Sequence, residues 1–155
     1  MGAAAIPGFN RIYLPKAEAG VRLFGSDWER VIERLRALNP HGTLLVMTVY
    51  NPYNRTQNLA RAYRADRGLH ELTEHYLSKI NAVIESQCRG RYQIVDIHAL
   101  FDRFSHGEMG RVASLYSSGF YLLRNPHPTS YGHWLIARAH AEEIERVLPP
   151  ALPGQ

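Results

Sequence analysis

An apolar, β-branched run at residues 43–50 constrains the fold of this chain more than any other stretch. Such a run is typical of a parallel-sheet strand that is buried on both faces. The segment before it predicts an amphipathic helix that begins near Ser26, with Glu29 placed for a capping box. Residues 39–42 end this helix with Asn, Pro and Gly. A helix followed closely by a doubly buried strand indicates an α/β fold.

The same alternation continues downstream. Apolar positions between residues 69 and 88 recur on one side of a long helix, and Gly90 follows it. Residues 92–98 form a second β-branched run that leads into a helical turn at 99–102. This order predicts parallel strands joined by right-handed crossovers, in a three-layer α/β/α arrangement. Two strands cannot cover three amphipathic helices, so we expect either that residues 1–24 add a strand or that the sheet is larger.

Length and composition predict one globular domain. The chain has 155 residues, of which 45% are hydrophobic. Residues 1–24 lack a clear period and are expected to form an irregular arm, residues 25–148 the domain, and residues 149–155 a tail. No apolar run is long enough to cross a membrane, so stable membrane insertion is not expected, and localisation stays open. The lone Cys88 excludes a disulfide within the chain and is expected to be a small buried hydrophobe.

A histidine between two prolines is the strongest candidate for chemistry. Pro126 and Pro128 flank His127 and favour extended backbone on both sides of it. Thr129 or Ser130 can then cap a C-terminal helix. An imidazole held in this way can act as a general base near neutral pH. The alternative is that His127 is a polar residue in a proline-rich turn.

The order of these motifs resembles the C-terminal half of the SGNH hydrolases, the GDSL-type esterases and lipases. The resemblance covers residues 28–148, and four pieces carry it. The first two are a helix ending in Leu38-Asn39-Pro40 and a strand leading into Tyr50-Asn51-Pro52-Tyr53. The others are the pair Ile80-Asn81 and Ile94-Val95-Asp96, and the block His127-Pro128-Thr129-x-x-Gly132-His133. The last piece is the most specific. The resemblance implies a flavodoxin-like fold. It also implies a reaction without a cofactor, in which a serine activated by His127 attacks an ester or thioester carbonyl.

Two departures from the family pattern limit this expectation. The Gly-Asp-Ser block that carries the nucleophile is not found, and residues 25–27, Gly-Ser-Asp, are predicted to be a helix cap instead. The glycine and asparagine of the oxyanion hole are also not found. The family's aspartate three residues before the histidine is replaced by Arg124, which cannot accept the ring N–H. A backbone carbonyl or Glu108 could orient the ring instead.

The chain is therefore expected to be inactive by itself. An N-terminal segment missing from it, or a partner chain, would complete the sheet, and the substrate would be a small ester or acyl compound.

Other functions fit parts of the sequence. A non-catalytic α/β binding or assembly module would make His127 structural. A basic nucleic-acid domain could use the net charge of +4 and a group of tyrosines and arginines. These are Tyr50, Tyr53, Tyr63, Arg55, Arg61, Arg64 and Arg67. They are predicted to form a solvated lid or loop beside a pocket instead, so no nucleic-acid partner is expected.

The other histidines are candidates for a metal site, and the serines are candidates for the nucleophile. Neither His70 with His75 nor His133 with His140 has the spacing of a helical metal site. These histidines are predicted to lie on the surface or at caps, and no metal is expected. The five candidate serines do not lie at a strand-to-helix elbow, so none is predicted to be the nucleophile. They are Ser105, Ser114, Ser117, Ser118 and Ser130.

Overall fold

The computed structural model describes residues 9–55, 64–114 and 126–148. It is an α/β structure, mostly helical, with a small parallel sheet of two strands. The elements, in chain order, are α1 (Phe9–Leu38), β1 (Leu45–Met47), α2 (Arg64–Ser86), β2 (Gln93–Val95), α3 (Ile97–Asp102), α4 (Met109–Val112) and α5 (Ser130–Val147). The predicted alternation of helices and strands is confirmed.

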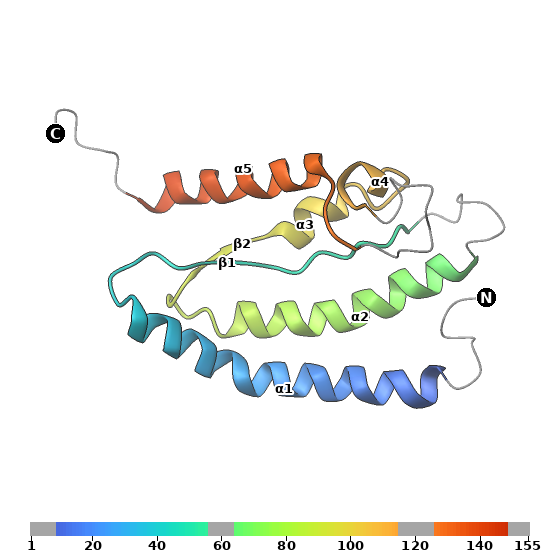
Figure 1. The fold of residues 1–155 in the computed structure, drawn as a ribbon, viewed down its shortest axis with the longest axis horizontal. Helices are drawn as coiled ribbons and strands as arrows, with labels where there is room; N and C mark the ends of the chain where they lie inside the picture. The colour runs from blue at the N-terminus through green and yellow to red at the C-terminus, as the bar shows by residue number, and fades with distance from the viewer. Residues whose placement is uncertain (1–8, 56–63, 115–125, 149–155) are drawn as a thin grey trace.

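The two strands pair in parallel, as predicted. Leu45 lies opposite Gln93 and Met47 opposite Val95. The Thr48 amide continues the pairing by donating to the Val95 carbonyl at 3.0 Å. Figure 1 shows α1 and α2 on one side of the pair and α5 on the other.

Two apolar clusters explain this layering, because successive side chains of a strand point to opposite faces. On the side of α1 and α2, Leu44 and Val46 pack against buried Ile32, Ile84 and Tyr92. On the other side, Leu45 packs against a larger buried cluster from β2 and the helices that follow it. That cluster consists of Val95, Ile97, Phe101, Met109, Val112, Ala113 and Leu135. The sheet is therefore covered by helices on both faces.

Helix α1 begins much earlier than predicted. Residues 9–24 were expected to be irregular, yet they are helical through Pro15, and Ser26 lies inside the helix instead of capping it. A contact with α2 stabilises this extension, because Lys79 Nζ donates to Glu18 Oε1 at 2.9 Å. Next to it, Gln87, just beyond α2, donates from Nε2 to the Gly25 carbonyl at 3.2 Å. Tertiary contacts thus outweigh the weak local signal. No other strand forms in the described part of the chain.

Strand β1 is shorter and more exposed than predicted. Regular pairing covers Leu45–Met47 instead of residues 43–50, and the side chains of Met47 and Val49 remain 38% and 37% exposed. Beyond the strand, the side-chain amide of Asn81 on α2 binds both the Val49 N–H, at 2.8 Å, and the Val49 carbonyl, at 3.0 Å. A side chain takes the place of a neighbouring strand there.

The predicted helix ends are confirmed at three points. Helix α1 ends at Leu38, before the Asn-Pro turn. After α2, Arg89 and Gly90 have positive φ values of 41° and 74°, which reverse the chain toward β2. Thr129 caps α5, because its side chain accepts a hydrogen bond from the Gly132 amide.

Candidate functional site

The loop before α5 holds His127 through its backbone. The Tyr50 hydroxyl, just beyond β1, donates to the Pro126 carbonyl, and the Ser114 amide donates to the His127 carbonyl at 2.8 Å. Burial raises the pKa of Tyr50 to about 12, so its hydroxyl keeps its proton at neutral pH. The carbonyls on both sides of the His127 Cα are therefore fixed, and the histidine is tied to the carboxyl end of β1.

A short antiparallel bridge fixes the loop from the side of α4. Ala113 pairs with Pro128, and the Thr129 amide donates to the Val112 carbonyl at 2.8 Å. Gly132 allows this close approach, because a Cβ at that position would lie 2.2 Å from the Val112 carbonyl oxygen. The glycine of the His-Pro-Thr-x-x-Gly motif thus has a packing reason in this structure.

His127 itself is exposed on this loop. Arg124, predicted to replace the family's aspartate, lies outside the described residues. Glu108 is exposed, and its carboxylate lies 3.3 Å from the Arg111 guanidinium. Which group orients the imidazole of His127 stays a prediction.

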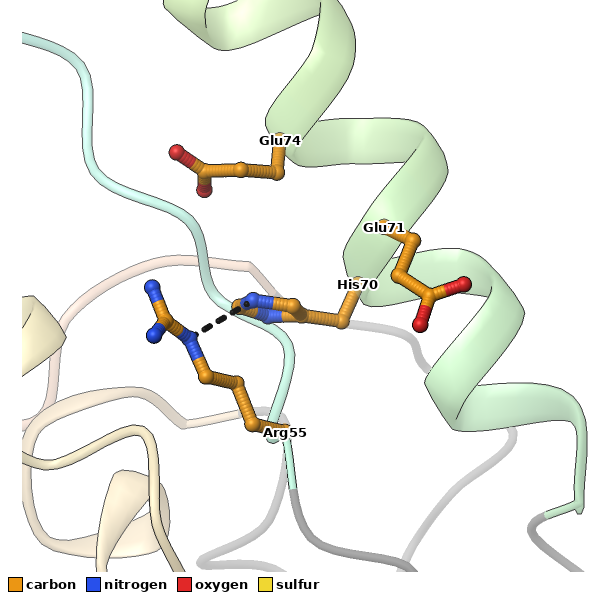
Figure 2. Close-up of a pocket in the computed structure, with 4 residues that line it drawn as sticks. All are labelled: Arg55, His70, Glu71 and Glu74. Atoms are coloured by element: carbon orange, nitrogen blue, oxygen red, sulfur yellow. Dashed lines mark hydrogen bonds between the residues drawn. The ribbon is translucent and has the colours of Figure 1, made fainter.

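A polar pocket lies beyond the same end of β1. It has a volume of about 430 Å³ and is lined by Arg55, from the segment after β1, and by His70, Glu71 and Glu74 on α2. Figure 2 shows these four side chains and the hydrogen bond between Arg55 and His70. The segment from Tyr50 to Arg55 therefore runs from the His127 loop to this pocket.

His70 is held in one neutral tautomer. Its ring is buried, and Nε2 lies 3.1 Å from Arg55 Nε, which can only donate. Nε2 must therefore accept, and Nδ1 carries the proton that it donates to the Tyr53 carbonyl at 2.8 Å. The prediction that His70 lies at the surface or at a cap is wrong, because loop atoms surround its ring. His75 and His133 are exposed, as predicted.

Arg55 and Glu74 are each held by several partners. Arg55 Nη2 lies 2.6 Å from Asp102 Oδ1 on α3. Glu74 accepts a hydrogen bond from buried Asn51 at 3.0 Å, and His98 Nε2 lies 2.8 Å from its other oxygen. Burial raises the pKa of Glu74, but the Asn51 hydrogen bond and the nearby positive charge of His98 outweigh it and lower the pKa below 4.5.

Asn51 joins the loop to α2. Its amide nitrogen also donates to the His70 carbonyl at 3.1 Å, and its oxygen accepts from the Tyr53 amide at 3.1 Å. Neighbouring groups therefore hold three of the four lining side chains, those of Arg55, His70 and Glu74.

The sequence predicts a lid or loop beside a pocket at Arg55, but it does not identify the α2 residues that line this pocket. His70 was a candidate only through its spacing to another histidine. The available signal was the polar segment directly after a buried strand, where α/β proteins place their ligands. Within the described residues, no group of three or more His, Cys, Asp or Glu side chains is arranged to hold a metal ion.

Comparisons with protein families, curated proteins and solved structures give no significant match to this chain. Among the helices that the structure describes, none is both long and apolar enough to span a membrane.

Proposed function

We propose that this chain is the C-terminal, histidine-bearing part of an SGNH/GDSL-type serine esterase or lipase with a flavodoxin-like fold. One observation carries the proposal: the Tyr50 hydroxyl and the Ser114 amide hold the His127 loop beside the carboxyl end of β1. Ligands of parallel α/β sheets bind at this end of the strands. The polar pocket at the same end supports the proposal, because an ester substrate has a polar part to accommodate.

In the proposed reaction His127 moves the protons. Its imidazole takes the proton of a serine hydroxyl while the serine oxygen bonds to the ester carbonyl carbon. The imidazolium then gives this proton to the departing alkoxide as the ester C–O bond breaks. Water, deprotonated by the same imidazole, releases the acyl group and restores the serine. The serine would come from a strand that neighbours β1.

The open edge of β1 supports this source of the serine. The Gln93 amide donates to the Leu44 carbonyl, and the Thr48 amide donates to the Val95 carbonyl. The backbone N–H and C=O groups of the even-numbered residues in and beside β1 therefore point toward β2. The N–H and C=O groups of Leu45 and Met47 point away from β2, and the described part of the chain gives them no partner. Unpaired edges bind further strands. The proposed occupant of this edge is the strand that leads to the serine.

The test compares this chain with the same chain extended by its upstream coding sequence. Both are assayed with p-nitrophenyl butyrate and with a fluorophosphonate that labels activated serines. We expect turnover and labelling of the extended protein only, with turnover lost in its His127→Ala variant. His41→Ala is the matched control, because exposed His41 lies in the turn before β1, at the other end of the strand.

Two results would contradict the proposal. Esterase activity of the extended protein that survives His127→Ala would assign another base. An extended protein that is folded but neither turns over the ester nor reacts with the fluorophosphonate would favour the non-catalytic binding module.

A further inference from the structure

Side chains of α5, of α4 and of the segment after α3 form a row of aromatic rings and arginines that the proposed reaction does not use. We name Phe104, Arg111, Tyr131, Trp134 and Arg138 the aromatic–arginine row. The rings of Tyr131 and Trp134 stack with centroids 5.6 Å apart and planes 16° apart. Phe104 meets Tyr131 edge to face at 6.4 Å.

Arginines complete the row. The Arg138 guanidinium lies 4.9 Å from the centre of the Trp134 ring, and Arg111 lies 5.6 Å from that of Tyr131. Tyr131 precedes Trp134 by about one helical turn and Arg138 follows it by about one turn, so they lie on opposite sides of the indole. The row itself therefore contacts the faces of the indole through Tyr131 and Arg138.

The row is exposed at the helix that follows the His127 loop. Tyr131 and Trp134 are 40% and 50% exposed. The structure gives the Tyr131 hydroxyl and the Trp134 indole N–H no hydrogen-bond partner within the described residues. Arg111 is joined to the loop, because its carbonyl accepts a hydrogen bond from Thr129 Oγ1 at 2.6 Å. Arg138 and Arg111 each keep one acidic neighbour, Glu142 at 3.1 Å and Glu108 at 3.3 Å.

We infer that the aromatic–arginine row docks on the surface of a phospholipid membrane, and that the ester handled at His127 is presented there. The second clause rests on the proposed function. Tyr and Trp rings with free polar edges favour the boundary between headgroups and acyl chains, and arginines favour lipid phosphates. Nucleic-acid bases stack on open ring faces, which Trp134 does not offer. Peripheral docking of this kind needs no membrane-spanning helix.

Vesicle binding by the full chain tests the docking. We expect it to sediment with phosphatidylcholine vesicles that contain phosphatidylglycerol, and more weakly with phosphatidylcholine alone. Replacing Tyr131 and Trp134 together by Ser should lower the affinity about tenfold or more. Arg138→Gln should lower it roughly fivefold on the anionic vesicles only. Leu23→Ser is the matched control, because Leu23 is 62% exposed on α1, which covers the opposite face of the sheet.

Fluorescence locates the contact. The chain has two tryptophans, Trp28 and Trp134. Brominated lipids should quench the wild-type emission, and this quenching should disappear in Trp134→Phe, because Trp28 packs in the core beside Tyr92. Circular dichroism and thermal unfolding verify that each variant is folded.

Four results would overturn the docking inference. Two concern vesicles: no binding by the wild type, or binding that is unchanged in the double variant. The others are binding of oligo-dT that the double variant abolishes and a dimer of the chain that the double variant dissociates. In the extended protein, the double variant should slow hydrolysis of a vesicle-borne ester more than that of p-nitrophenyl butyrate. Vesicle binding does not depend on turnover, so a failure of the docking is separable from a failure of the proposed esterase.

Discussion

The His127 loop and the polar pocket lie at the same end of β1 but are built in different ways. The loop is exposed, and backbone groups of residues 112–114 and the Tyr50 hydroxyl hold it. The pocket instead depends on buried side chains, Asn51 and His70, whose partners come from the loop after β1 and from α2. The first arrangement presents one side chain to its surroundings. The second fixes several charges before any ligand arrives.

The largest expected effect is a loss of ester turnover when His127, in the loop, is replaced. In the extended protein, His127→Ala should lower ester turnover by roughly 10²- to 10⁴-fold, because a general base would be lost. Main-chain groups hold the loop, so the substitution should cost less stability than a change in the buried network of the pocket. The measurements are kcat/KM with p-nitrophenyl butyrate and the urea midpoint of unfolding. A large loss of stability with unchanged turnover would reverse the roles of the loop and the pocket.

The next effect concerns the pocket. Asn51→Leu should lower the free energy of unfolding by about 2–4 kcal/mol, because the Tyr53 amide and the His70 carbonyl would lose buried partners. Urea denaturation measures this loss. The control is Asn39→Leu at the exposed end of α1, which should be nearly neutral. Equal effects of the two changes would show that the Asn51 network does not hold the pocket.

Alanine substitutions at two glycines, Gly132 and the control Gly20, test the packing of the His127 loop. Gly132→Ala should destabilise by roughly 1–3 kcal/mol, because its Cβ would meet the Val112 carbonyl oxygen at 2.2 Å. Gly20→Ala, in α1 with no atom within 4 Å of the added Cβ, should instead stabilise by about 0.5–1 kcal/mol. Thermal unfolding distinguishes the two. A neutral Gly132→Ala would mean that α5 does not approach α4 so closely.

A smaller effect is expected for the tie between β1 and the loop. Tyr50→Phe removes one hydrogen bond to the exposed Pro126 carbonyl and should cost about 0.5–1.5 kcal/mol. In the extended protein it should also lower turnover, since the position of His127 would be less well fixed. Tyr76→Phe on α2 is the control. Turnover that falls equally in both variants would contradict this role of Tyr50.

The pH dependence of stability gives the smallest effect. The pKa of Glu74 is lowered in the folded state, so below about pH 4.5 the unfolded chain binds the proton first and stability falls with falling pH. Glu74→Gln removes this contribution and should make the loss of stability on acidification shallower. Urea midpoints measured across this pH range test it. Glu33→Gln, which removes an exposed carboxylate from α1, is the control for the loss of one charge.

Local features of the sequence were enough for the order of the elements. The Asn-Pro turn after Leu38, Gly90 and the Thr129 cap act within a few residues, and each lies where predicted. The parallel pairing of two β-branched runs followed from the long helical segment between them. The two prolines and the cap also act on neighbouring residues, so they identified the His127 loop. The role of this loop in catalysis remains a proposal.

Only the tertiary structure decided the length of α1, the exposure of β1 and which residues line the pocket. Residues 9–24 form a helix because α2 offers Lys79 to Glu18, a partner that is 61 residues away in sequence. Asn51, His70 and His98 meet around Glu74 because three separate segments converge beyond β1. Caps and turns are determined by neighbours in sequence, whereas such contacts depend on how the elements pack. Local sequence therefore determined where α1 and α2 end and where α5 begins, whereas packing determined where α1 begins and which polar side chains share a site.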